Sequence, residues 1–248
     1  MKEPRQDFYS WLTSDAPPVV ESMGLNWLIA AAIATVVLWQ FPAGDYILYP
    51  FSILATWFHE MGHGLMALIL GGRFHQLQIF SNGSGLASYS ISRSLWPLGP
   101  ALVAAAGPMG PPIAGAGLIL ASRSFSTASL SLKILGGVLL LSTLLWVRSW
   151  FGLLAIPVLG IIILGISLRT PHWVQGFGIQ FLGVQACVST FHQLNYLFSS
   201  NAGSLGLSDT GQMQRYLILP YWFWGGLMAI ASLVILFQSL RIAYRSQV

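Results

Sequence analysis

Two histidines and a glutamate lie close together in the segment His59-Glu60-Met61-Gly62-His63. Residues four positions apart lie on the same face of a helix, so His59 and His63 can present two imidazole nitrogens to one metal ion. Zinc binds imidazole at about 2.0–2.1 Å, and a histidine pair one turn apart meets that geometry without strain. Glu60 is then beside the metal without binding it, where its carboxylate can take a proton from a metal-bound water that attacks a carbonyl. The spacing predicts a zinc-dependent hydrolase with Glu60 as its general base.

The chain around this segment carries very few charges. Of its 248 residues, 55% are apolar and 7% are charged, whereas roughly 25% are charged in a soluble domain. Apolar runs of about 20 residues, long enough to cross a hydrocarbon core roughly 30 Å thick, recur along the sequence. We therefore predict an all-α, integral multi-pass membrane protein with about six to seven transmembrane helices, at 25–42, 47–70, 97–121, 131–147, 150–168, 174–198 and 216–240. In a prokaryote its location would be the cell membrane.

Polar residues inside these spans need partners, because lipid offers none. Glu60 is the one acidic residue inside any predicted span, and an unpaired charge there costs at least ~2.5–3.5 kcal/mol. A cation beside Glu60 would offset that cost, which favours a metal site. The span at 174–198 is the least regular, because it is interrupted by Gln180, Gln185, His192, Gln193 and Asn195.

The basic residues exclude one class of partner. The formal net charge is +4, but the lysines and arginines occur singly at the ends of apolar runs and form no patch with interleaved aromatic residues. We therefore expect contact with a lipid bilayer and no nucleic-acid binding. The positive charges are nearly balanced between the two sides, so they do not fix the orientation in the membrane.

Between the second and third predicted spans lies the one stretch with strand character. Its first run alternates with a two-residue period, with Phe74, Gln76, Gln78 and Phe80 on one side and His75, Leu77 and Ile79 on the other. Asn82-Gly83 then precedes a second run at 86–92, and this dipeptide is the strongest short signal for a hairpin turn. We predict a short membrane-associated β-hairpin that leans on the helices or on another strand. Its exposed edge could hold an extended substrate, and a plain connecting turn is the alternative.

A run of glycine and proline at 107–112 interrupts the third predicted span. Small residues let helix backbones approach closely, and prolines free carbonyl groups that lipid cannot satisfy. The run is therefore expected to be a kinked packing face, and it can also line a catalytic cleft.

With these motifs the sequence resembles the intramembrane zinc metalloproteases related to site-2 protease, most closely their compact bacterial and plant B-type branch. Besides His59, Glu60 and His63, the resemblance rests on Leu70-Gly71-Gly72-Arg73, Ser84-Gly85, the run from Ala106 to Pro111, and Ser208-Asp209 followed by Pro220 and Trp224. It implies a zinc metalloendopeptidase that acts on a membrane protein or peptide. Residues 25–248 are then a single membrane-embedded metalloprotease domain, and residues 1–24 are a polar N-terminal segment without the apolar centre of a signal peptide.

A catalytic zinc usually has three protein ligands and one open position. The resemblance assigns the third ligand to Asp209. Four predicted spans separate the end of the metal helix from the loop at 199–215, so an even number of crossings returns Asp209 to the same side. Ser208 or Asp209 could instead cap the last helix. His192 is the alternative third ligand, whereas His75 and His172 are expected at the surface or the membrane interface.

Two other functions stay open. One is a zinc-binding membrane protein without proteolytic activity, such as a transporter or a chaperone-like relative; the other is a metal-dependent hydrolase of a lipid or small molecule. The intact Glu60 argues against the first, because holding a metal does not require a general base. A transporter would also be expected to show further carboxylates along a path through the membrane, and no others occur in the predicted spans.

Overall fold

The computed structural model describes residues 25–203 and 206–245, so the segment predicted at 1–24 lies outside the described residues. The described part is mostly helical, with one two-stranded antiparallel sheet. Its elements are α2 (Leu25–Leu38), α3 (Pro42–Ile69), β1 (Arg73–Ile79), β2 (Gly85–Ser90), the 3-10 turn η1 (Arg93–Leu95), α4 (Leu98–Ala121), α5 (Phe125–Leu145), α6 (Trp150–Arg169), α7 (His172–His192), α8 (Leu194–Leu197), α9 (Asp209–Tyr216) and α10 (Tyr221–Arg245).

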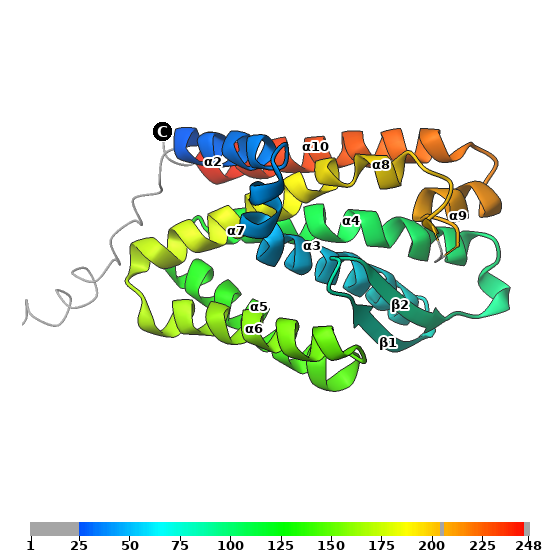
Figure 1. The fold of residues 1–248 in the computed structure, drawn as a ribbon, viewed down its shortest axis with the longest axis horizontal. Helices are drawn as coiled ribbons and strands as arrows, with labels where there is room; N and C mark the ends of the chain where they lie inside the picture. Colours follow the sequence, from blue (N-terminus) through cyan, green and yellow to red (C-terminus); the bar gives the residue numbers. More distant parts are fainter. Residues whose placement is uncertain (1–24, 204–205, 246–248) are drawn as a thin grey trace, which may run out of the picture.

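The long helices lie side by side in three groups (Figure 1). α5 and α6 pair on one side, α2 and α10 lie on the other, and α3, α4 and α7 pass between them. Four helices of the described part, α4, α5, α6 and α10, are long and apolar enough to cross a membrane. Large apolar side chains cover their outward faces, among them Leu144, Leu154, Ile161, Ile230 and Phe237. α3 and α7 fall outside this group of four, and both carry buried polar side chains.

Several helix ends differ from the predicted ones, and each difference has a local cause. α5 begins at Phe125 instead of 131, because the Ser124 side chain accepts a hydrogen bond from the Thr127 amide and caps the helix. The run predicted at 174–198 divides at Gln193 into α7 and the short α8. The last helix begins at Tyr221 instead of 216, directly after Pro220, and the separate helix α9 precedes it.

The glycine and proline run does not interrupt its span, so that prediction was wrong. α4 is continuous from Leu98 to Ala121 and contains Pro108, Pro111 and Pro112. Close packing supports the continuous helix, because glycines let the backbone of α4 contact α3 and α7 directly. A Cβ at Gly110 would collide with the Phe58 carbonyl of α3, and one at Gly115 would lie 2.5 Å from the Gly183 carbonyl of α7.

The predicted hairpin is present, but its alternation is broken. A bulge between Phe74 and Gln76 shifts the register, so Phe74 is buried on the same side as Leu77 and Ile79. The reason is packing, since Phe74 stacks on Trp146 and covers α3 at Gly64, where a Cβ would meet its ring.

The hairpin leans on the connection between α5 and α6. Leu77 forms an isolated parallel bridge with Val147, and its amide donates to the Trp146 carbonyl at 2.8 Å. The Ser149 hydroxyl accepts from the Ile79 amide and donates to the Ile79 carbonyl. The outer edge of β1 is therefore occupied, while β2 has no strand partner beyond β1 among the described residues.

Candidate metal centre

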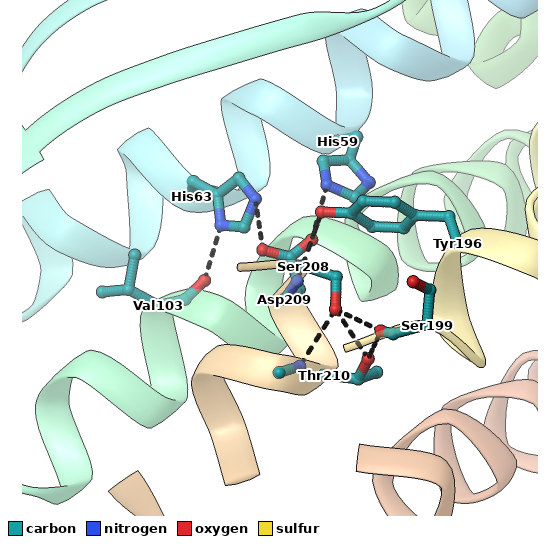
Figure 2. Close-up of polar contacts among 9 residues, drawn as sticks. His59, His63, Val103, Tyr196, Ser199, Ser208, Asp209 and Thr210 are labelled. Atoms are coloured by element: carbon teal, nitrogen blue, oxygen red, sulfur yellow. Dashed lines mark hydrogen bonds and ion pairs between the residues drawn. The ribbon is translucent and has the colours of Figure 1, made fainter. Parts of the chain in front are cut away.

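α3 carries the two histidines and the glutamate on its buried length. His59, Glu60 and His63 are each less than 8% exposed. Because His59 and His63 are one turn apart, their rings lie together, with centroids 4.9 Å apart. Figure 2 shows both rings turned toward the same point, the start of α9.

Asp209 meets the two histidines at that point, although it lies 146 positions after His63 in the chain. Its Oδ2 lies 2.9 Å from His59 Nε2, and its Oδ1 lies 3.3 Å from His63 Nε2 (Figure 2). One ligand atom from each of these residues falls within 4.8 Å of the others, and this is the one such group of histidine, cysteine, aspartate or glutamate in the described part of the chain. All three residues are buried.

The protonation of His63 bears on what occupies this point. Its Nδ1 lies 2.8 Å from the Val103 carbonyl oxygen of α4, and since a carbonyl only accepts, Nδ1 carries the proton. The Nε2 of a neutral His63 then points a lone pair at a carboxylate oxygen of Asp209. Two acceptors in contact need a cation or a second proton between them. Imidazole nitrogens and a carboxylate are zinc ligands, and tetrahedral zinc places its ligand atoms about 3.3 Å apart, so the residues present fit a zinc ion.

The carboxylate is available as a ligand. Burial alone would raise the pKa of Asp209, but a positive charge on the adjacent His63 or His59 lowers it more and keeps it below its usual range, and a cation bound beside neutral histidines would act in the same direction.

The segment Ser208-Asp209-Thr210-Gly211 is held against residues 199 and 200 by hydrogen bonds and close packing. Ser208 caps α9 by accepting from the Gly211 amide at 3.0 Å, and its hydroxyl also donates to the Ser199 carbonyl. The Thr210 hydroxyl donates to the same carbonyl at 3.1 Å. A side chain at Gly211 would collide with the Ser200 carbonyl. The neighbours of Asp209 thus tie the start of α9 to residues 199 and 200, and Ser208 is the cap.

α4 approaches the histidines through a glycine. A Cβ at Gly107 would collide with His63 Nε2 and lie 2.8 Å from His59 Nε2. Gly107 therefore packs closely against both histidines, as expected for a packing face, whereas no residue of the 107–112 run lines the cleft described below.

The hairpin approaches Glu60 in the same way. A Cβ at Gly85 would lie 2.6 Å from Glu60 Cγ and 2.7 Å from its Oε1. The Thr56 hydroxyl donates to the Gly83 carbonyl at 2.7 Å, and the Tyr49 hydroxyl donates to the Ser81 carbonyl at the same distance. α3 therefore holds the hairpin turn against the glutamate that it carries.

A cleft of about 880 Å³ opens onto these residues. Its walls come from α3, from residues 82–87 and 89 of the hairpin, from the end of α7 and from residues within 195–202 and 207–212. His59, Glu60, His63 and Asp209 all line it. Tyr89 lines it too, with its ring stacked on His63 at 6.3 Å; burial, then the negative charge of Asp209, raises the pKa of Tyr89 to about 12.

The other histidines lie elsewhere. His192 lines the cleft but packs on Trp39, with ring centroids 4.6 Å apart, and is not part of the cluster of possible ligands. His75 is exposed on β1 beside the Ser90 hydroxyl, and the exposed His172 packs on Phe125.

Sequence reasoning missed three residues that surround the cluster, namely Val103, Tyr89 and Tyr196. Val103 acts through its backbone carbonyl, and the residue type gives no sign of that role. The tyrosines lack a local spacing signal, because they lie on other elements than the histidines.

The comparisons define the class of protein. A family profile described as Peptidase M50B-like matches residues 28–239, which is 212 of the 248 residues. The chain belongs to this family, as its resemblance to the site-2 proteases predicted, and is thereby related to metallopeptidases of the membrane. Comparisons with curated proteins and with solved structures gave no match.

Proposed function

We propose that this protein is an intramembrane zinc metalloprotease that hydrolyses peptide bonds of membrane-embedded or membrane-adjacent polypeptides. The main support is that His59, His63 and Asp209 lie together in one cluster that opens onto the cleft beside Glu60. His59 and His63 would hold the metal through Nε2, and Asp209 through its carboxylate. When bound, zinc supplies a Lewis acid that polarises a carbonyl and makes water a nucleophile at neutral pH.

Glu60 is the proton carrier in this proposal. Hydrolysis joins the oxygen of water to the carbonyl carbon, breaks the carbon–nitrogen bond and requires a proton on the leaving nitrogen. The Glu60 carboxylate takes the proton that water loses and delivers it to that nitrogen. Val103 holds His63 in the tautomer that leaves Nε2 free, and Gly85 leaves room for the Glu60 side chain beside the hairpin.

The hairpin supports a polypeptide as the substrate. β2 lines the cleft at Gly85, Leu86, Ala87 and Tyr89, and its outer edge has no strand partner among the described residues. An extended peptide can pair with such an edge through main-chain hydrogen bonds, which fit any sequence. The edge would hold an unwound substrate segment across the site.

We further propose that residues 25–248 form one membrane-embedded domain in which α3 and α7 also cross the bilayer, which makes six crossings, and seven if α2 crosses as well. Their polar side chains support this, because Gln175, Gln180 and Gln185 of α7 are buried within the protein, as are the three polar residues of the site on α3. Neither helix needs to present those groups to lipid.

The proposed function is tested by offering the purified, reconstituted protein a labelled single-span peptide and a labelled lipid ester. We expect the peptide to be cut, the ester to remain intact, and a zinc chelator to stop cleavage until zinc is restored. Hydrolysis of the ester alone would favour a lipid hydrolase. Zinc binding without hydrolysis of either would favour the non-proteolytic alternative.

A further inference from the structure

Tyr196 lies in the wall of the cleft on the short helix α8, beside the metal cluster. Its hydroxyl donates to Asp209 Oδ2 at 3.0 Å and accepts from the Asp209 amide at 3.2 Å (Figure 2). One phenol thus contacts both the side chain and the main chain of a single residue. Its ring also meets the His59 ring edge-on, with centroids 6.1 Å apart.

The two contacts use the hydroxyl once as a donor and once as an acceptor. A phenol has one proton to donate, and here it goes to the carboxylate, while an oxygen lone pair receives the amide. The pair of bonds fixes the carboxylate relative to the backbone that carries it. Asp209 needs such a fixed orientation, because it is the first residue of α9 and follows a loop, whereas both histidines are set by one continuous helix.

We propose that Tyr196 is a positioning residue for Asp209: it orients the carboxylate toward the point between His59 and His63 and so sets the affinity of the site for zinc. This inference rests on the proposed function, in which Asp209 is the third ligand. The hydroxyl would act through Asp209, because both of its hydrogen bonds are made with that residue. Partners of this kind orient metal ligands, and their loss typically weakens metal binding by 10–100-fold.

The test is Tyr196→Phe, which removes the hydroxyl and keeps the ring on His59. We expect the zinc dissociation constant, measured by competition with a chelator, to rise by about 10–100-fold. The matched control is Tyr49→Phe, since Tyr49 also lines the cleft and its hydroxyl also donates one hydrogen bond, but to the Ser81 carbonyl. That variant should bind zinc as the wild type does.

A double variant separates positioning from general stabilisation. If Tyr196 acts through the carboxylate, Tyr196→Phe should weaken zinc binding in the wild-type background but add nothing to the residual affinity of Asp209→Ala, measured at zinc concentrations high enough to fill that weakened site. Equal zinc affinity of the wild type and Tyr196→Phe would overturn this inference alone, as would an undiminished effect in the Asp209→Ala background. A wild-type protein that binds no zinc would contradict the proposed function, and the inference would be lost with it.

Discussion

Asp209 directs both carboxylate oxygens at imidazoles, while the neighbouring Ser208 provides the helix cap. Sequence reasoning left ligand and cap as alternatives for these two residues. In the structure Ser208 caps α9 rather than the last helix, and the Asp209 carboxylate lies against the two histidines. The two residues can therefore be tested separately.

Asp209→Asn should lose zinc and activity nearly as fully as Asp209→Ala, because an amide is a poorer zinc ligand than a carboxylate. Ser208→Ala is the matched control, and it should lower the free energy of unfolding by about 0.5–2 kcal/mol while saturating zinc still binds. Elemental analysis and thermal unfolding in detergent measure both quantities. Full zinc content and activity in Asp209→Asn would show that the third ligand lies elsewhere, and His192 would be the next residue to replace.

The histidine pair and Glu60 could be predicted from the sequence because their spacing is local. Helical periodicity alone brings His59 and His63 together. Asp209 could be assigned only from the family resemblance and a count of crossings, since it lies 146 positions after His63. Tyr196 was beyond prediction, because its value depends on the atoms that the fold of α8 and α9 brings within hydrogen-bonding distance.

The close approach of α4 to the histidines leads to a prediction about zinc binding. Gly107→Ala should weaken zinc binding by at least ~10-fold, because its Cβ would occupy the space of the imidazole nitrogens of His63 and His59. Gly117→Ala is the control on the same helix, where a Cβ would meet nothing within 4 Å. That variant should keep its zinc and gain slightly in stability, since alanine favours a helix more than glycine does. Equal zinc affinity in the two variants would refute the proposed close approach.

Element types followed from sequence patterns, whereas element boundaries did not. The hairpin was predictable from Asn82-Gly83, but the bulge after Phe74 depends on its packing against Trp146, which lies 72 residues further along the chain. The continuity of α4 through its prolines was also misjudged. A local rule treats proline as a break, and here the contacts with α3 and α7 determine the outcome.

For the whole molecule, the number of membrane crossings can be tested by labelling. Cysteines at Gln40, Ser94, Ser126, His172 and Asn201 would flank α3, α4, the α5–α6 pair and α7. If α3 and α7 cross, an impermeant reagent should label Ser94→Cys and Asn201→Cys from one side of the membrane. It should label Gln40→Cys, Ser126→Cys and His172→Cys from the other. Because Cys187 is buried, the unmodified protein is the unlabelled control.

Labelling of His172→Cys and Asn201→Cys from the same side would instead mean that α7 does not cross.

Composition was enough to predict a membrane protein, because 7% charged residues cannot cover a soluble domain of this length. The number of crossings was harder to predict, since α3 and α7 combine apolar faces with the polar residues of the site.

One comparison of two proteins tests whether Glu60 drives hydrolysis beside a zinc held by His59, His63 and Asp209. Wild type and Glu60→Gln would be reconstituted in lipid vesicles with a single-span peptide, and bound zinc and cleavage rate would be measured on the same samples. Both proteins should hold one zinc, because the ligands are unchanged, while cleavage should fall by at least ~10²-fold in the variant, which lacks the base. Cleavage by Glu60→Gln at the wild-type rate with zinc fully bound would show that Glu60 is not the general base.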